Sequence, residues 1–161
     1  MKTNLIIQRF VEDAGNMTQS FGLGRVVGQL YAYLYFNSKP RNLADMQNAL
    51  GISKGSASTA VRQLEQWGAA KKVWVKGDRK DYYEACDWFG RILKNAITDT
   101  FGKRMSSYTS LMHEVEEDLL SLEAKSDGDE AFIRQRIDSL RQFQQKAQGI
   151  LGNTIIQGLI K

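Results

Sequence analysis

Cysteine, histidine and proline are nearly missing from this chain, with one residue of each among 161. A disulfide framework needs paired cysteines, and zinc sites or Cys–His catalytic pairs need further Cys and His side chains. The sequence also lacks a charged-then-apolar leader and an apolar run of about 18 residues, the length that spans a membrane. These absences predict a cytoplasmic protein without membrane contact. The composition, 42% hydrophobic and 25% charged, suits one compact subunit with its own core.

The few side chains that could support catalysis stand apart from one another. His113 is the only imidazole, and Glu117 follows one helical turn later, which predicts a polar surface pair rather than a metal site. The acidic residues within 114–118 are interpreted as a solvated helix face, and acidic catalysis there is an alternative that nothing else supports. Redox sensing by Cys86 is a further alternative. No cysteine or histidine lies near Cys86 in the sequence to support it. We predict a protein that is not an enzyme, with no catalytic residue, metal or cofactor.

Residues 42–68 have the pattern of two short helices joined at a glycine. Apolar residues at helical spacing give the first helix one face, namely Leu43, Met46 and Leu50. Asn42 is a candidate N-cap for this helix, and Asp45 is favourably placed in its first turn. Gly51 permits the positive φ that ends the helix, and Ser53 can cap the next one. The pattern predicts a helix-turn-helix.

The second of these helices carries predicted contacts with DNA. Its apolar stripe consists of Ala57, Val61 and Leu64, which leaves small and polar residues on the outer face. Small residues at a helix N-terminus let phosphates approach the free N–H groups, while Arg62 can pair with guanine and Gln63 with adenine. The predicted contacts are Ser53, Lys54, Gly55, Ser56, Ser58, Thr59, Arg62 and Gln63. The alternative is an ordinary amphipathic helix pair with a solvated polar face.

A short basic hairpin, or wing, is predicted directly after this helix. Strand formers occupy 72–76 and 81–85, and the Gly77-Asp78 pair indicates a tight turn over 77–80. An arginine at such a tip suits the negative potential of a narrow minor groove, and Asp78 is placed to orient the Arg79 guanidinium. The predicted DNA contacts of the wing are Lys76, Arg79 and Lys80. The alternative is a solvated charged turn.

Positive charge is concentrated in the same region. Residues 39–80 hold nine Lys and Arg against three acidic residues, a net charge of +6, whereas the whole chain carries +4. The rest of the chain is therefore net negative. Positive charge gathers where a phosphate backbone would lie, so binding is expected to weaken steeply as salt rises.

Two amphipathic helices are predicted before the helix-turn-helix. Apolar residues recur at helical spacing in both, and a glycine-rich break over 22–24 separates them. In the first helix these residues are Ile6 or Ile7, Phe10, Ala14, Met17 and Phe21. In the second they are Val26, Val27, Leu30, Tyr31 and Leu34. Pro40 marks the next break.

A long helix is predicted from about Trp88, with a heptad seam that would pack against another helix. The seam residues are Phe101, Met105, Tyr108, Met112, Val115, Leu119 and Leu122. A turn over 125–129 then leads into a second helix, which would complete an antiparallel hairpin. Its apolar residues are Phe132, Ile133, Ile137, Leu140, Phe143, Ala147, Ile150 and Leu151. The last apolar residues are expected to pack on the first helix or on a partner subunit, and they are Ile155, Ile156, Leu159 and Ile160.

Three stretches, 24–35, 43–68 and 76–85, resemble regulators of the glycine betaine synthesis repressor (GbsR) type. That group belongs to the multiple antibiotic resistance regulator (MarR) superfamily of dimeric winged helix-turn-helix proteins. The expected fold is mainly α with a small β-wing, and the long helices form a dimerisation region. The expected domains are an N-terminal helix in the dimer interface (1–22), the winged helix-turn-helix (23–86) and a helical-hairpin dimerisation region (87–161).

The resemblance implies a transcriptional regulator, expected to be a repressor, that binds specific double-stranded DNA. A homodimer would place its recognition helices about 34–36 Å apart on a pseudopalindromic operator. A small-molecule effector of unknown identity is a further expected partner. Aromatic residues that could cage a small cation, with core packing as the alternative, are Tyr31, Tyr33, Tyr35, Trp67, Trp88 and Tyr108. The alternative function is a winged-helix module for protein partners or non-specific nucleic-acid binding.

Overall fold

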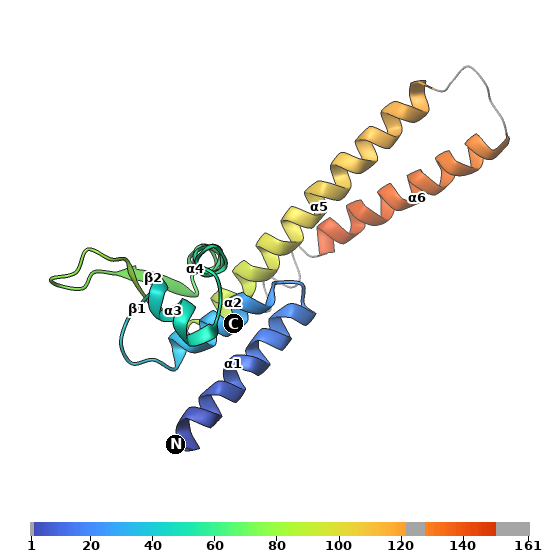
Figure 1. Cartoon of the computed structure of the whole chain (residues 1–161). Coiled ribbons are helices and arrows are strands. Elements are labelled where there is room, and N and C mark those ends of the chain that lie inside the picture. Colours follow the sequence, from blue (N-terminus) through green and yellow to red (C-terminus); the bar gives the residue numbers. More distant parts are fainter. Residues whose placement is uncertain (1, 122–127, 151–161) are drawn as a thin grey trace. The chain divides into compact units, whose positions relative to one another are not determined.

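The computed structural model describes residues 2–121 and 128–150, with side chains described over 4–119 and 129–149. These residues form a mainly helical fold with one small sheet, as the sequence predicts (Figure 1). The chain divides into two compact units, Met1–Ala96 and Ile97–Lys161, with the division inside α5. The elements in chain order are α1 (Lys2–Ser20), α2 (Arg25–Tyr35), β1 (Arg41–Asn42), α3 (Leu43–Leu50), α4 (Lys54–Gln66), β2 (Ala70–Val73), β3 (Tyr82–Ala85), α5 (Phe89–Ser121) and α6 (Gly128–Ile150).

The helix-turn-helix consists of α3 and α4, and its predicted caps are confirmed. The Asn42 side chain accepts a hydrogen bond from the Asp45 N–H (3.1 Å), and the Asp45 carboxylate accepts one from the Asn42 N–H (3.0 Å), which forms a capping box. Gly51 ends α3 with φ 64°, a left-handed conformation that favours glycine. The Ser53 hydroxyl caps α4 by accepting from the Ser56 N–H (3.1 Å). Local hydrogen bonds therefore mark both ends of α3 and the start of α4.

A three-stranded antiparallel sheet with order β1-β3-β2 follows the helix-turn-helix. Strand β3 lies in the middle, with Tyr83 opposite Arg41 on one side and Lys72 on the other. The sequence prediction missed β1, because two residues after a proline carry no alternating pattern. The sheet joins the chain before α3 to the wing after α4.

The predicted strands and tight turn of the wing are partly wrong. Strand β2 starts earlier than expected and ends at Val73, so an open loop over 74–81 replaces the end of the strand and the predicted turn. Inside this loop the Asp78 N–H donates to the Val75 carbonyl (3.2 Å), and the Asp78 side chain accepts from the Lys80 N–H (3.0 Å). These bonds turn the chain within the loop, and the pairing of β2 with β3 ends at Val73 and Tyr82.

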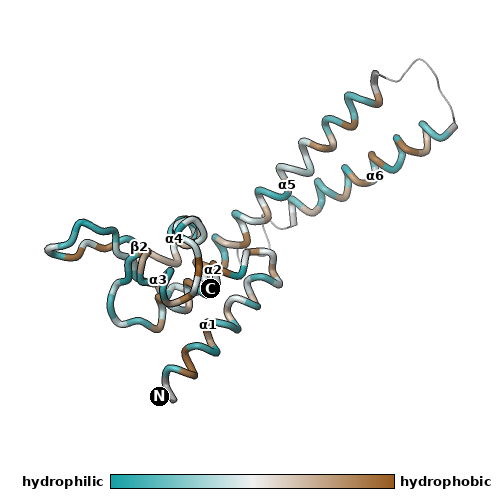
Figure 2. Tube along the Cα trace, in the orientation of Figure 1, coloured by the Kyte–Doolittle hydropathy of each residue, from teal (hydrophilic) through white to brown (hydrophobic). Residues whose placement is uncertain are grey.

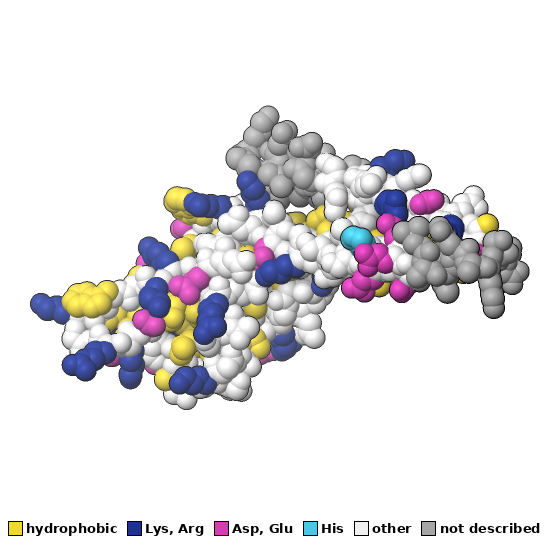
Figure 3. All heavy atoms as spheres, turned by 90° about the horizontal axis from the view of Figure 1, so that it is seen from above, with side chains coloured by type: hydrophobic (Ala, Val, Ile, Leu, Met, Phe, Trp, Pro, Cys, Tyr) yellow, Lys and Arg dark blue, Asp and Glu magenta, His cyan; other side chains and the backbone are white. Residues whose placement is uncertain are grey.

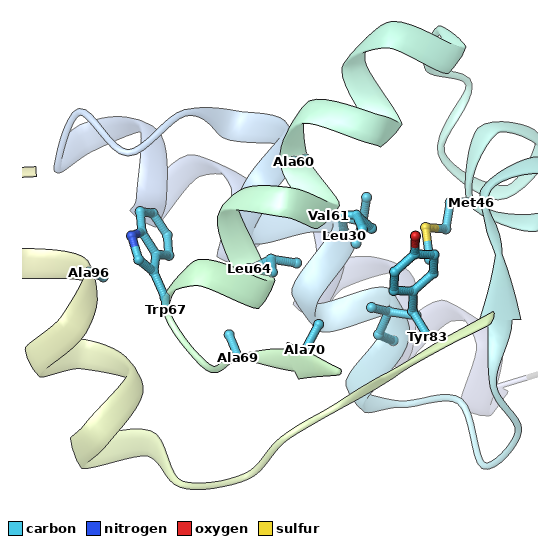
Figure 4. Close-up of a cluster of buried hydrophobic side chains, with 11 residues drawn as sticks. Leu30, Met46, Ala60, Val61, Leu64, Trp67, Ala69, Ala70, Tyr83 and Ala96 are labelled. Carbon is cyan, nitrogen blue, oxygen red and sulfur yellow. The ribbon is translucent and has the colours of Figure 1, made fainter. Parts of the chain in front are cut away.

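The core of the first unit lies between α2, α4 and the sheet (Figure 4). Leu30 and Met46 are fully buried, and the predicted apolar stripe of α4 is buried as expected, together with Ala60. Trp67 lies at one end of this cluster beside Ala96 of α5, and Tyr83 lies near Met46 at the other end. The apolar face of α4 is therefore packed in the core, and its polar face is exposed to solvent.

Two glycines allow α1 and α2 to pack closely. A Cβ on Gly28 would collide with the Ala14 carbonyl oxygen and the Thr18 hydroxyl, and one on Gly15 would collide with the Gln29 side chain. The Thr18 hydroxyl donates to the Ala14 carbonyl (3.0 Å). Val11 and Gly15 consequently form the buried face of α1.

The predicted apolar stripe of α1 lies largely in solvent. Brown, apolar positions mark α1 in Figure 2, and most of them are exposed within this chain. The exposed large apolar residues of α1 and its C-terminal end are Leu5, Ile6, Phe10, Met17 and Phe21. The Phe10 ring contacts Phe36 of the segment after α2, with centroids 5.2 Å apart. Ile6, Met17 and Phe21 are also exposed, whereas Ile7 and Ala14 are half-buried.

The second unit contains the predicted antiparallel helix pair (Figure 1). The Arg134 guanidinium donates to the Leu119 carbonyl (2.9 Å), and the Gln144 amide donates to the Thr109 hydroxyl (2.6 Å). An ion pair joins Arg141 to Glu116 between these contacts. As residue numbers rise along α6, the numbers of their partners on α5 fall, which is the pattern of an antiparallel helix pair.

Most of the large apolar residues predicted for α6 are exposed. Half-buried residues of α6 are mostly polar, including Arg134, Arg141 and Gln144, while the large apolar residues Phe132, Ile133, Leu140 and Phe143 are exposed. Polar and ionic contacts join the two helices of the predicted hairpin, and Ile137 and Ala147 of the predicted apolar set are half-buried. The predicted seam of α5 is half-buried at most positions between 101 and 119.

Several predictions fall on residues that the structure does not describe. Leu122, Leu151 and the apolar residues at 155–160 lie outside the described residues, as does the Ile150 side chain. Helix α6 begins at Gly128, so Asp129 belongs to the helix and not to the predicted turn over 125–129.

Candidate nucleic-acid interface

The outward face of α4 is built from small and polar residues. Lys54, Gly55, Ser56, Thr59 and Arg62 are exposed, whereas Ser58 and Gln63 are half-buried. The first turn therefore presents backbone N–H groups that no bulky side chain covers. A helix N-terminus of this kind favours an anion, through its free N–H groups and its dipole.

Ser53 differs from its predicted neighbours in how its side chain is used. Its hydroxyl accepts from the Ser56 N–H and donates to the Ser56 hydroxyl (3.0 Å). The Ser53 side chain is therefore occupied as a helix cap, and its contribution to a site is mainly structural. Arg62, two turns further along, extends from the exposed face without a salt bridge within the described part of the chain.

The wing loop presents the three cations predicted for it. Lys76, Arg79 and Lys80 are all exposed. Figure 3 shows dark blue side chains gathered at the wing, the end that carries the β2–β3 loop in Figure 1. The first unit thus brings together an open helix N-terminus and a basic loop, although more than ten residues separate them in the chain.

Asp78 shapes the wing in a way the sequence did not reveal. Its carboxylate accepts hydrogen bonds from the Lys80 N–H (3.0 Å) and the Tyr82 hydroxyl (2.8 Å). These bonds, led by that from Lys80, hold the pKa of the Asp78 carboxyl below its ordinary value. The interpretation that Asp78 orients the Arg79 guanidinium is wrong. The carboxylate fixes the loop backbone instead, and Arg79 extends from that fixed backbone.

Two of the nine cations in the basic region are neutralised across the hairpin. Lys71 pairs with Glu84 (2.8 Å) and Lys72 with Asp81 (2.9 Å), and each partner carboxylate raises the pKa of its lysine. Both acids follow residue 80, so the net charge of +6 for 39–80 overstates the local excess. The positive charge that remains for a ligand is concentrated on α4 and on the wing loop.

The six aromatic residues considered for a cation cage are divided between the two units, with Tyr108 in the second unit and the other five in the first. Trp67 is only 4% exposed and belongs to the core, so it is wrong as a cage member. The Tyr31 and Tyr35 rings lie 6.0 Å apart, and Tyr35 also contacts Phe89 at 5.5 Å. A hollow of about 670 Å³ lies beside these rings and is lined by residues that include Tyr35, Cys86, Asp87 and Trp88.

His113 and Glu117 form the surface pair that the sequence predicts. Their nearest atoms, Nδ1 and Oε1, are 3.7 Å apart, and both side chains are largely exposed. Within the described residues no group of three or more His, Cys, Asp or Glu side chains is placed to hold a metal ion. Among the described helices, none combines the length and apolar character needed to cross a membrane.

Comparison with known proteins identifies relatives among helix-turn-helix (HTH) regulators. The chain is 30% identical over 113 residues to YvaV of Bacillus subtilis, a predicted HTH-type transcriptional regulator, covering 70% of this chain and 64% of YvaV. It is 27% identical over 140 residues to the HTH-type transcriptional repressor OpcR of the same organism, covering 84% of this chain and 75% of OpcR. It is 29% identical over 110 residues to the repressor GbsR, covering 68% and 61%. No protein-family model matches the chain.

A solved structure supports the fold. The crystal structure of a transcriptional regulator matches 96% of this chain and 99% of its own, with a TM-score of 0.57 and 21% identity. The chain is a winged helix-turn-helix protein related to HTH-type transcriptional regulators, GbsR among them, as the sequence resemblance predicts. These relatives are named as transcriptional regulators, in agreement with the prediction that the protein is not an enzyme. The chain spans less than two thirds of the length of YvaV and of GbsR.

Proposed function

We propose that this protein is a sequence-specific double-stranded DNA-binding transcriptional regulator that acts as a repressor. The observation that carries the proposal is the pairing, in one unit, of an open α4 N-terminus with an exposed basic wing loop. A helix of this kind fits a major groove, and a basic loop beside it fits the adjoining minor groove or its phosphates. Two relatives are named repressors, which supports the same function.

Within this proposal the predicted residues have three roles. Lys54, Gly55, Ser56, Ser58 and Thr59 bring the start of α4 against phosphates and base edges, with Ser53 as the cap that holds this turn. Arg62 and Gln63 read bases in the major groove. The wing cations Lys76, Arg79 and Lys80 contact the minor groove or its phosphates.

The proposal includes a homodimer on a pseudopalindromic operator. Large apolar side chains are exposed on α1 in the first unit and on α6 in the second, and monomers rarely leave such rows open. A second copy that covers them would repeat the DNA-binding face by two-fold symmetry. The operator would then contain two half-sites related by the same symmetry.

We further propose that a small-molecule effector controls DNA binding, and that the protein acts in the cytoplasm. The hollow beside Cys86 supports the effector proposal, because it lies where β3 leads into α5. A ligand there would contact both the wing sheet and the start of the long helix. It would thereby shift the protein between states that fit or misfit an operator.

Selection of DNA from a randomised duplex pool by the purified protein at physiological salt tests the function. The expected result is a pseudopalindromic motif bound at least ~10³ times more tightly than scrambled duplex. Absence of an enriched motif, with only weak and salt-sensitive binding, would overturn the proposal. That result would favour a winged-helix module for protein partners or for non-specific nucleic-acid binding.

A further inference from the structure

Trp74 is exposed to an unusual degree for a tryptophan. Its relative exposure is 79%, the largest among the exposed large apolar residues of the described chain. Trp67, in contrast, is buried in the core, and the Arg91 guanidinium lies over the Trp88 ring at 5.5 Å. Within the described residues Trp74 has no such ring contact. An exposed indole of this size is a candidate contact for a binding partner.

The position of Trp74 is fixed by the wing on which it lies. It directly follows Val73, which pairs with Tyr82 in the sheet. The salt bridge between Lys72 and Asp81 and the bonds of Asp78 to Lys80 and Tyr82 hold both arms of the loop. Exposure of Trp74 is therefore a property of a braced loop, and a braced backbone leaves only the side-chain rotamers to be ordered on binding.

The surroundings of Trp74 are positively charged. Lys76, Arg79 and Lys80 are exposed on the same loop, while its acids, Asp78 and Asp81, are engaged by hydrogen bonds or an ion pair. Figure 3 shows a yellow side chain among dark blue ones at the wing. This combination fits a polyanion with apolar surface, and a DNA groove provides both, the charge on its phosphates and the apolar surface on its deoxyribose walls.

We propose that Trp74 contacts duplex DNA, with its indole packed against the sugars of the groove that the wing enters. This inference rests on the proposed function and adds an apolar contact to a set of residues that is otherwise polar or cationic. The contact would strengthen binding without neutralising a phosphate. Apolar and cationic contributions can therefore be separated by their dependence on salt.

The first test compares Trp74→Ala, Trp74→Phe and Arg79→Ala for affinity toward the selected duplex over a series of salt concentrations. Trp74→Ala is expected to lose about 10-fold in affinity, in line with the loss of one aromatic–nucleotide contact, with an unchanged slope of log K against log salt. Trp74→Phe is expected to recover most of the affinity. Arg79→Ala, the cationic control, is expected to reduce the slope by about one.

The second test uses fluorescence. Binding of the duplex is expected to change the emission of the wild-type protein and to protect it from acrylamide quenching, and both effects should be absent in Trp74→Phe. Wild-type affinity in Trp74→Ala, or DNA-induced emission changes that persist in Trp74→Phe, would overturn the inference. A changed salt slope in Trp74→Ala would also overturn it, since that result would mean that the substitution displaces the cations. Failure of the wild-type protein to bind any duplex would instead contradict the proposed function.

Discussion

The Tyr31 hydroxyl donates a hydrogen bond of 2.7 Å to the Cys86 carbonyl, across 55 positions of the chain. Tyr31 lies in α2, and Cys86 begins the connector from β3 to α5. The Cys86 N–H donates to the Ala69 carbonyl (2.8 Å), so both backbone polar groups of Cys86 are hydrogen-bonded. Burial, reinforced by Tyr35, Cys86 and Asp87, raises the pKa of Tyr31 to about 12. This bond links the winged helix-turn-helix to the start of the long helix.

Removal of this hydroxyl is expected to change stability in a pH-dependent way. Tyr31 ionises near 10 when unfolded and near 12 when folded, so its contribution is complete below pH 10 and is lost as pH rises toward 12. Tyr31→Phe should cost about 1 kcal/mol at neutral pH, the typical value of one hydrogen bond. Urea denaturation from pH 8 to about pH 12 measures the free energy of unfolding of the wild type and of Tyr31→Phe. The difference between them should shrink at the alkaline end, and a constant difference would contradict the assignment.

Asp78→Asn is expected to loosen the wing and to weaken DNA binding. The neutral amide is a poorer acceptor for the Lys80 N–H and the Tyr82 hydroxyl, so Lys80 and Arg79 would lose their fixed backbone. Loss of a negative charge would by itself strengthen DNA binding, and a net loss of affinity therefore identifies the structural effect. Glu114→Gln, which removes an exposed acid of α5 outside the wing loop, is the control.

The ionisation of Asp78 provides an independent check on the same bonds. Because the folded pKa lies below its ordinary value of 3.8, the stabilisation is present above that value and is lost as pH falls through the folded pKa. In NMR spectra the Lys80 amide resonance should titrate with a midpoint below 3.8 in the wild type. It should not titrate in this way in Asp78→Asn, and a midpoint above 3.8 would contradict the assignment.

Arg62→Ala and Arg79→Ala are expected to weaken binding in different ways. A base-reading arginine discriminates between sequences by about 1–3 kcal/mol, so Arg62→Ala should lose affinity for the selected operator and little for random duplex. Arg79→Ala or Lys80→Ala should lower affinity for both duplexes and flatten the salt dependence. Fluorescence anisotropy measures the affinity of each variant, relative to the wild type, for the operator and for the random duplex. Equal losses on operator and random duplex for Arg62→Ala would show that Arg62 does not read bases.

Gly28→Ala is expected to destabilise the first unit. The added methyl group would collide with the Ala14 carbonyl oxygen and the Thr18 hydroxyl, and backbone cannot move aside without separating α1 from α2. Overpacking of this kind costs about 1–3 kcal/mol. Gly102→Ala is the matched control, because nothing lies within 4 Å of its Cβ, and it should stabilise α5 by roughly 0.5–1 kcal/mol. Thermal unfolding should show the melting temperature lowered in Gly28→Ala and raised in Gly102→Ala, relative to the wild type.

The proposed dimer should depend on the exposed apolar residues of α1 and α6. Phe10→Glu and Phe143→Glu each place a charge where the proposed interface excludes water, and both should shift the protein toward monomer. Sedimentation equilibrium at micromolar concentration measures the shift. Gln142→Glu, at an exposed polar position of α6, should leave the association unchanged. A wild-type protein that is monomeric under these conditions would contradict the dimer.

Much of the helix-turn-helix could be predicted because its signals are local. The caps at Asn42 and Ser53 and the turn at Gly51 depend on hydrogen bonds between residues three or four positions apart. Spacing within one helix is enough to predict which face of α4 is buried. The sequence also predicted correctly that α5 starts near Trp88 and that a second helix pairs with it.

Contacts between distant residues decided the rest of the candidate site. No local pattern indicates that Lys71 and Lys72 are paired across the hairpin, or that Asp78 binds Tyr82 instead of orienting Arg79. The apolar rows of α1 and α6 were equally ambiguous, because a periodic pattern shows that a face is apolar and not what covers it.

The sequence by itself determined both ends of α3, the start of α4, which residues form the α4 stripe, and that positive charge gathers around α4 and the wing. Only the tertiary structure decided which cations remain exposed, how the wing loop is braced and that Trp74 lies in solvent. The physical reason is the range of the interactions. Caps and helical spacing act within one turn of the chain, whereas ion pairs, side-chain bonds across strands and burial depend on which distant segments fold together.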